Sequence, residues 1–316
     1  MAILIPVKRM ISRYSALNSL PAGSAPDTVT AGCIVLEGGA FRGLYTSGAL
    51  DALMQAGLNF QCTVGVSAGA LNGMNYASGQ IGRSAQINLR FRHDPRYVGL
   101  RAVPKNRGVI GFDFVFGKME NVPAFDKKRF CDRRRKFYAV ASNLRTGQAE
   151  FIGKGSGVSM YQAVRASASM PYISRPVMLG DRPCLDGGCT VNIPYQWAIN
   201  QGYEKVVVIR TRERSFRKPP QPPADRKLRI EQLYRAYPAF MEQLMHSHAR
   251  YNRECEELEA LEASRRIFVI APSQPVTVGR LEPDMEKLGA LYWLGYHNAQ
   301  AAIPALRAYL EGESAE

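Results

Sequence analysis

The stretch Gly65-Val66-Ser67-Ala68-Gly69 places a serine between two glycines at the end of an apolar run that starts at Phe60. Because small residues with helical spacing follow, Ser67 is predicted to lie on a sharp turn from a strand into a helix. Such a turn exposes the hydroxyl as a nucleophile and admits only small neighbours, here Gly65 and Gly69. The structural alternative is a serine that caps the following helix. The motif alone does not separate the two, since the chain has 28 glycines.

A second glycine-rich stretch, GGAFRG, follows the apolar run from Cys33 to Glu37. If both runs are parallel strands, the turns after them meet at one edge of the sheet. Backbone N–H groups of this loop would then stabilise the oxyanion that forms when a serine attacks a carbonyl. A nucleotide phosphate is the alternative ligand, although the G-x-G-x-x-G order is missing. The Arg42 side chain is expected in a structural ion pair. The candidate oxyanion residues are Gly38, Gly39, Ala40, Phe41, Arg42 and Gly43.

The third motif is Asp186 followed by Gly187 and Gly188. An Asp-Gly-Gly sequence is also an ordinary turn, so the motif indicates a catalytic carboxylate only together with the other two. A rival serine, Ser159, has a glycine before it but Tyr161 in place of the second glycine. Ser67 is therefore the better candidate nucleophile.

In this order and at these separations, GGAFRG, GVSAG and DGG resemble the patatin-like phospholipases. The resemblance covers roughly residues 32–210. It implies an α/β fold, hydrolysis of lipid acyl esters, and a Ser–Asp dyad in place of a Ser–His–Asp triad. By this resemblance Ser67 is the nucleophile and Asp186 is the base. The glycine loop is the oxyanion hole, and no metal or cofactor takes part.

One position departs from the family pattern, because Ala40 stands where the glycine loop usually has a third glycine. Alanine keeps its backbone N–H, so the hydrogen-bond donor is retained. The substitution matters only if this position requires a positive φ, which alanine adopts at a cost.

Two other functions fit parts of the sequence. The first is a Ser–His–Asp hydrolase. Its catalytic residues occur in the order Ser, Asp, His in α/β-hydrolases, and His246, His248 and His297 all follow Asp186 here. Against it, the Ser67 motif comes after a single Gly-rich strand–helix unit, and these histidines lie in stretches with helical spacing. The other alternative is a protein of the same fold that binds lipid or nucleic acid without turnover.

The elements around the motifs predict how they are positioned. Residues 33–77 alternate strand, helix, strand, helix, which favours a central, mostly parallel sheet with helices on both faces, a three-layer α/β fold. Residues 1–30 are interpreted as an arm and linker, 31–212 as the catalytic core, and 213–316 as a Pro-rich loop and a helical region packed on it. Residues 217–227 are expected to form an exposed loop, and Pro304 to kink or split the C-terminal helix.

Composition is that of an ordinary globular protein, with 46% hydrophobic and 22% charged residues among 316. The six cysteines include no C-x-x-C pair, which argues against a zinc site and for reduced thiols. Cys184 and Cys189 are interpreted as buried structural thiols. The N-terminal apolar run is too short for a secretory signal, and no run approaches a membrane span. A cytoplasmic protein is expected, with lipid or another acyl ester as its substrate.

Positive charge is concentrated in one part of the chain. Residues 83–136 hold 15 Lys/Arg and 5 Asp/Glu, and so carry +10 of the net +14. A solvated face is the simplest explanation, and contact with anionic membrane lipids is the sharper one. Nucleic acid is disfavoured, since no known nucleic-acid-binding motif is present. Five further basic residues after the run VVVI extend the predicted membrane surface: Arg210, Arg212, Arg214, Arg217 and Lys218.

Overall fold

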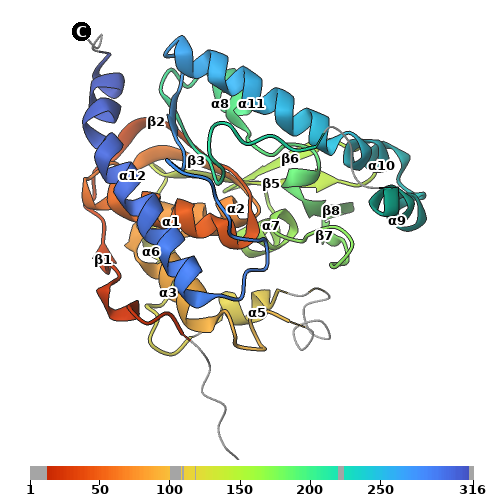
Figure 1. Cartoon of the computed structure of the whole chain (residues 1–316), viewed down its shortest axis with the longest axis horizontal. Helices are drawn as coiled ribbons and strands as arrows, with labels where there is room; N and C mark the ends of the chain where they lie inside the picture. The colour runs from red at the N-terminus through yellow and green to blue at the C-terminus, as the bar shows by residue number, and fades with distance from the viewer. Residues whose placement is uncertain (1–12, 100–107, 109, 118, 220–223, 313–316) are drawn as a thin grey trace, which may run out of the picture.

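A mixed, mostly parallel sheet of eight strands forms the centre of the molecule (Figure 1). The computed structural model describes residues 13–99, 108, 110–117, 119–219 and 224–312. Strand order is β10-β9-β2-β3-β5-β8-β7, with β6 also paired to β5, and β1 and β4 form a separate pair. The strands are β1 (Gly23–Ser24), β2 (Thr30–Leu36), β3 (Phe60–Val66), β4 (Gln80–Ile81), β5 (Lys136–Asn143), β6 (Ala149–Gly153), β7 (Val177–Leu179), β8 (Arg182–Asp186), β9 (Val206–Ile209) and β10 (Phe268–Ile270).

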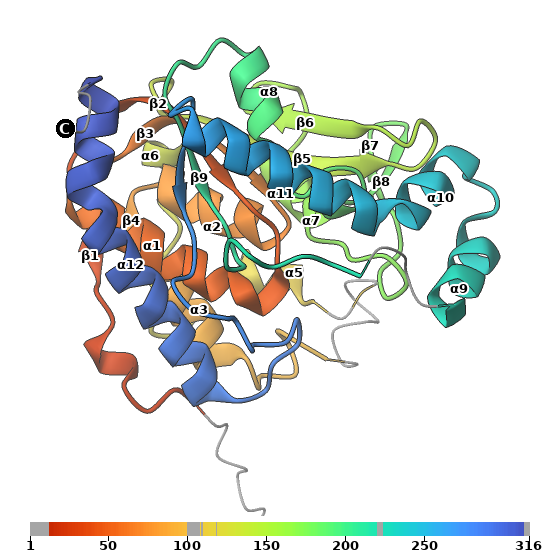
Figure 2. The same cartoon turned by 45° about the horizontal axis from the view of Figure 1, so that its top comes forward.

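Helices cover both faces of this sheet (Figure 2). One face packs against α1, α2, α7 and α12, and the other against α8 and α11. The helices are α1 (Gly43–Gln55), α2 (Ala68–Ala77), α3 (Arg83–Phe91), α5 (Phe112–Val115), α6 (Lys127–Phe130), α7 (Met160–Ser167), α8 (Tyr195–Asn200), α9 (Ala224–Tyr234), α10 (Pro238–Met245), α11 (Ser247–Ala263) and α12 (Met285–Glu311), with 3₁₀ turns at Leu17–Ser19, Ala40–Arg42 and Gly187–Cys189.

The central strands are apolar on both sides, which explains their burial between two helical layers. In β2, Ile34 and Leu36 face the α1 side, whereas Cys33 and Val35 face the α11 side. Continuous apolar runs of this kind are typical of parallel strands covered by helices on both faces. The predicted three-layer α/β fold is confirmed.

The pairing of β5 brings two distant strand ends together. β3 pairs along one edge of β5 with the first residues of β5, and the last pair is Val66 opposite Val140. β6 pairs with the same residues, so it lies along the other edge. β8 pairs from Ala141 onward, at positions that β6 also pairs, and it therefore lies along the edge that β3 occupies. Since Asp186 is opposite Ala141, the antiparallel β8 meets β3 end to end.

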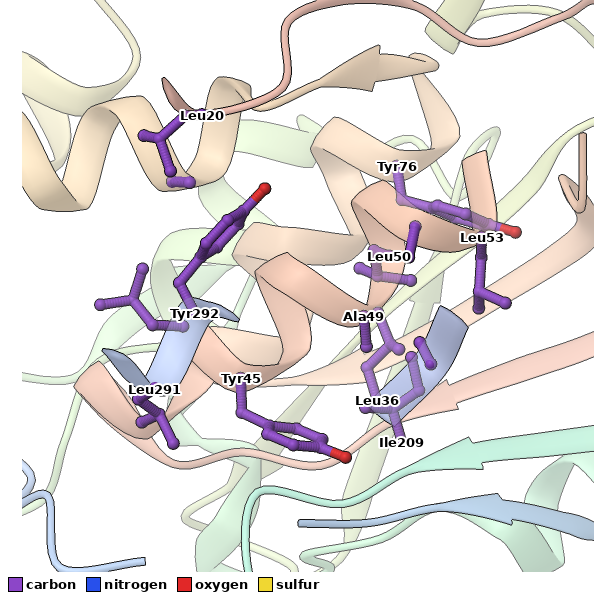
Figure 3. Packing of buried hydrophobic residues seen from close by; sticks show 14 of the residues in the cluster. Leu20, Leu36, Tyr45, Ala49, Leu50, Leu53, Tyr76, Ile209, Leu291 and Tyr292 are labelled. Atoms are coloured by element: carbon purple, nitrogen blue, oxygen red, sulfur yellow. The ribbon is translucent and has the colours of Figure 1, made fainter. Parts of the chain in front are cut away.

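The C-terminal helix α12 packs along α1 (Figure 1). Leu291 and Tyr292 of α12 belong to the same buried cluster as Tyr45 of α1 (Figure 3). A Cβ added to Gly48 would lie 2.0 Å from the Tyr292 carbonyl oxygen, and one added to Gly295 would lie 2.0 Å from that of Tyr45. The two helices therefore touch backbone to backbone through reciprocal glycines. Pro304 lies within α12 and does not divide it, so the expected split is wrong.

Residues on either side of the predicted core also pack on it. Leu17 and Leu20 are buried, and Tyr14 lies against α12 at Gly289. Residues 1–12 of the predicted arm lie outside the described residues. None of the helices among the described residues combines the length and apolarity needed to cross a membrane. Cys184 and Cys189 are buried, as predicted.

The segment after β9 departs from expectation. Arg210 is fully buried and donates to the Cys255 sulfur at 3.2 Å, so it belongs to no surface. Arg214 and Arg217 form ion pairs with two glutamates of α11, Glu262 and Glu259. The predicted exposed loop 217–227 is wrong at both ends, because Arg217 and Lys218 are half-buried and α9 begins at Ala224. Residues 220–223 lie outside the described part.

Candidate active site

Ser67 lies between the end of β3 and the start of α2, with φ 55° and ψ −120°. A positive φ is costly for a residue with a side chain, so the surrounding backbone must hold this conformation. Gly65 and Gly69 allow it: a Cβ at Gly65 would lie 2.5 Å from the Gly69 carbonyl, and one at Gly69 would lie 2.4 Å from the Leu36 carbonyl oxygen. The chain therefore turns sharply from β3 into α2 at Ser67, with other backbone in close contact at both glycines.

Asp186, at the end of β8, accepts a hydrogen bond from the Ser67 hydroxyl, with 2.6 Å between Oγ and Oδ2. Its Oδ1 accepts from the Gly188 N–H at 2.8 Å, which fixes the carboxylate plane. At Gly187 an added Cβ would lie 2.3 Å from the Val140 carbonyl oxygen, so this position needs glycine. The serine and the aspartate are 119 positions apart in the sequence, and the end-to-end meeting of β3 and β8 brings them together.

The Asp186 carboxyl has an altered acidity. Burial raises its pKa to about 6, and the hydrogen bonds from Ser67 and Gly188 and the positive charge of Arg280 offset part of that rise. Removal from water disfavours the charged form, whereas donors and cations favour it. At neutral pH the group is therefore a carboxylate that accepts protons more readily than an exposed aspartate does.

In the glycine loop, the backbone N–H groups of Gly38, Gly39 and Ala40 have no hydrogen-bond acceptor within the described part of the chain. The N–H groups of Phe41, Arg42 and Gly43 donate to carbonyl oxygens. Ala40 adopts φ 50°, which is the positive φ that makes alanine costly here. Of the six predicted oxyanion residues, three therefore retain unbonded donors.

Thr211, just after β9, holds this loop in place. Its hydroxyl donates to the Gly38 carbonyl at 3.1 Å, and its own N–H donates to Glu37 at 2.6 Å. Because a trans peptide points its C=O and N–H in opposite directions, the Gly39 N–H is directed away from Thr211. The Tyr251 hydroxyl donates to the other Glu37 oxygen at 3.1 Å, so the network is buried and satisfied.

Ser167, at the end of α7, holds the nucleophile turn from the other side. Its Oγ accepts the Ser67 backbone N–H at 2.9 Å, and its side chain is fully buried. This N–H is thereby occupied and does not add a free donor to those of the glycine loop. No sequence motif had pointed to Ser167 or to Thr211.

Two cavities meet at Ser67. A mostly apolar one of about 70 Å³ has both Ser67 and Ala40 in its wall, which also includes Leu44, Leu71, Ile87, Tyr97 and Val115. A larger polar one of about 230 Å³ contains Ser67, Asp186 and the glycine loop. Its remaining charged side chains are Glu37, Arg42, Arg212, Lys218 and Arg280.

The four histidines differ in their exposure to solvent. His93, His246 and His297 are exposed. His248 is buried in the wall of the polar cavity, where its Nδ1 lies 3.0 Å from the Pro219 carbonyl oxygen. The rival serine Ser159 is exposed at the start of α7. Among the described residues, no group of three or more His, Cys, Asp and Glu side chains is placed to hold a metal ion.

Models of known protein families match two segments of the chain. The model described as patatin-like phospholipase matches residues 34–199. Another, described as a domain of unknown function, matches residues 237–311, which include α10, α11 and α12.

Individual relatives are distant. The uncharacterized protein YjjU of Escherichia coli is 28% identical over 183 residues, which are 56% of this chain and 51% of that protein. The lysophospholipase NTE1 of Coccidioides immitis is 27% identical over 165 residues, 51% of this chain and 10% of that protein. The crystal structure of VipD from Legionella pneumophila aligns with TM-score 0.42 and 14% identity, over 95% of this chain and 70% of VipD. The aligned part of the chain covers about half of YjjU and a tenth of NTE1.

Proposed function

The chain belongs to the patatin-like phospholipase family, and from that premise we propose that it hydrolyses carboxylic ester bonds of lipids with Ser67 as nucleophile and Asp186 as base. The observation that carries the proposal is the 2.6 Å hydrogen bond between these side chains, in a cavity that also contains the unbonded N–H groups of the glycine loop. The lysophospholipase named among the relatives supports a lipid ester as substrate.

In the proposed reaction Asp186 accepts the Ser67 proton while Oγ bonds to the ester carbonyl carbon. The negative oxygen that forms lies against the N–H groups of Gly38, Gly39 and Ala40, and each such donor is worth about 3 kcal/mol of barrier. Collapse breaks the ester bond, and the alcohol leaves with the proton that Asp186 returns. Water then repeats the sequence on the acyl-serine, which releases the fatty acid and restores Ser67.

The two cavities fit the two parts of such a substrate. The apolar cavity would take the acyl chain, and the polar cavity would take the alcohol side of the ester. Both cavities contain Ala40, Ser67 and Met170. A substrate that occupies both therefore has its ester bond next to the nucleophile.

The test is labelling by a fluorophosphonate probe and hydrolysis of a soluble p-nitrophenyl ester. Ser67→Ala should lose both signals, and Asp186→Asn should lose nearly all hydrolysis while remaining folded. Absence of labelling in the folded native chain would instead favour a lipid-binding protein without turnover.

The Ser–His–Asp alternative is tested on the same ester, and His248 is its only candidate within the polar cavity among the described residues. His248→Ala should keep the rate within several-fold, and the exposed His93, His246 and His297 serve as controls. A loss of about a thousandfold, or 4 kcal/mol of barrier, at any one of them with the fold intact would replace the dyad by a triad.

We extend the proposal to the surface on which the enzyme works. Lys127, Lys128 and Arg133 are exposed cations of the basic stretch, and each basic residue near an anionic membrane contributes about 1 kcal/mol, screened by salt. Co-sedimentation with anionic vesicles should exceed that with neutral vesicles and fall at high salt. Equal binding to both at either salt concentration would exclude this contact.

A further inference from the structure

The polar cavity holds more positive charge than the proposed hydrolysis needs. Both of its carboxylates are already engaged: Glu37 accepts from Thr211 and Tyr251, and Asp186 from Ser67 and Gly188. None of the ion pairs between described residues includes a cation of this cavity. Those cations are Arg42, Arg212, Lys218 and Arg280.

The contacts of these cations leave charge available to a ligand. Arg42 was expected in an ion pair, but its Nε is buried without an acceptor, as is that of Arg212. The Arg212 guanidinium donates to the Val276 carbonyl. Lys218 Nζ lies 3.4 Å from the Asn192 amide oxygen, which is a weak partner for an ammonium.

The cations also weaken one another. Burial, followed by the positive charge of Arg280, lowers the pKa of Lys218 to about 7. Burial, followed by Arg212 and Arg280, lowers the pKa of Arg42 to about 10. The negative charge of Glu37 offsets part of both decreases. Crowded cations that are only partly compensated disfavour their own charged forms. A bound anion would reverse this effect, and Arg side chains match the oxygens of a phosphate particularly well.

The aromatic rings of the cavity argue against a cationic headgroup. A quaternary ammonium binds over an aromatic face. Here Lys218 Nζ already lies 3.9 Å from the centre of the Tyr251 ring, and the Arg212 guanidinium lies 4.4 Å from that of Phe216. One face of each ring is therefore occupied by a cation, and a choline group would have to displace it against the repulsion of the four basic side chains.

We propose that the polar cavity binds the phosphate of a lipid whose headgroup carries no compensating cation, so that the substrates are anionic phospholipids or lysophospholipids. This inference rests on the proposed function, because the acyl chain must lie in the apolar cavity for the phosphate to reach these cations. The cavities adjoin at Ser67, so one molecule places its acyl chain, ester and phosphate in that order.

The first experiment compares kcat/KM for two lysolipids with the same short acyl chain, lysophosphatidic acid and lysophosphatidylcholine, at concentrations where both are monomeric. The native chain should prefer the phosphate monoester at least tenfold. Lys218→Met replaces the ammonium that lies over the Tyr251 ring with an uncharged side chain of similar length, and Arg280→Gln removes an exposed cation. Each should lower the preference about tenfold, the usual effect of losing one charge-assisted hydrogen bond.

Arg307→Gln is the matched control for Arg280→Gln. Arg307 is exposed on α12 and donates to the carbonyl of Ala56, just after the end of α1 that is opposite the glycine loop. Its loss removes the same charge and should leave the preference between the two lysolipids unchanged. An equal change in this control would show that the net charge of the protein, not the cavity, sets the preference, and would overturn the inference.

A binding measurement separates this inference from the proposed function. Calorimetry on the Ser67→Ala variant should show dodecyl phosphate bound at least tenfold more tightly than dodecyltrimethylammonium, and a tenfold loss with Lys218→Met added. Inorganic phosphate bound as tightly as dodecyl phosphate would identify a free-phosphate site and overturn the lipid assignment. If Ser67-dependent hydrolysis is present but both lysolipids react alike, the inference fails and the hydrolase proposal stands. If no ester is hydrolysed, the hydrolase proposal fails.

Discussion

The acidity of Asp186 predicts how the proposed reaction depends on pH. A base must be unprotonated, and burial holds the pKa of this carboxyl at about 6. With a neutral ester, kcat/KM should therefore be constant above pH 7 and fall about tenfold by pH 5. The profile is measured between pH 4.5 and 8.5. A rate that is unchanged down to pH 5 would contradict Asp186 as the base with this pKa.

The same carboxyl should weaken the fold at neutral pH. Between about pH 4 and pH 6 the unfolded chain releases this proton first, so the native state binds more protons and stability falls as pH rises. Asparagine does not ionise, so Asp186→Asn avoids this decrease in stability. Its free energy of unfolding at pH 8 should be about 1–3 kcal/mol higher than that of the native chain. At pH 4 the gain should disappear. Urea denaturation at the two pH values measures it, and a gain that persists at pH 4 would require another cause.

Ser167 should matter through the backbone of Ser67. Ser167→Ala leaves the Ser67 N–H buried without its acceptor, which costs about 1–3 kcal/mol of stability. It should also lower kcat for a soluble ester more than it changes KM, because the turn at positive φ loses a restraint. The exposed Ser159→Ala is the control and should change stability by less than about 0.5 kcal/mol. Equal effects of the two substitutions would remove Ser167 from the site.

The positive φ at position 40 should limit which residues the glycine loop tolerates there. Glycine would relieve the strain that alanine has at φ 50°. It would also raise the conformational entropy of the unfolded chain, which lowers stability by a similar free energy. Ala40→Gly is therefore expected to change unfolding free energy by less than about 0.5 kcal/mol and to keep activity. Ala40→Val should lose more than about 1 kcal/mol and most of the hydrolysis. Thermal melts and ester assays test both, and a valine variant as active as the native chain would argue against this loop as the oxyanion hole.

The sequence was informative wherever one segment contains its own signal. The apolar run up to Val66, the small residues after Ser67 and the two flanking glycines together predicted β3, the turn and α2. Asp186 was predicted by a motif and its family resemblance, and no spacing showed that it would lie 2.6 Å from the Ser67 hydroxyl. That proximity depends on β3 and β8 sharing one edge of β5.

Residues that act across the fold were missed for the same reason. Thr211 and Ser167 have no local pattern, and each is defined only by the backbone group that it meets. The basic residues after β9 were interpreted as one surface, but the fold separates them into a buried arginine, two ion pairs and two residues of the polar cavity. Charge in a sequence does not show which side of the backbone reaches solvent.

The C-terminal region completes the site, so its packing on α1 should control activity. Arg280 and Leu281, just before α12, are in the walls of the polar and apolar cavities. Gly48→Ala places a Cβ 2.0 Å from the Tyr292 carbonyl oxygen, and should cost about 3 kcal/mol or more because backbone on both sides must move. Urea denaturation and ester hydrolysis measure the result.

Gly279→Ala is the control for that substitution, since its Cβ would have space and should change little. If Gly48→Ala is as stable as the native chain, α12 does not pack on α1 as described.

The end-to-end meeting of β3 and β8 also sets a time order for the chemistry. During synthesis Ser67 leaves the ribosome 119 residues before Asp186, which is about 6 to 24 s at ordinary translation rates. Throughout that interval the serine has no carboxylate to accept its proton. The nascent chain is therefore unable to attack an ester by the proposed route until β8 has been made and has paired with β5.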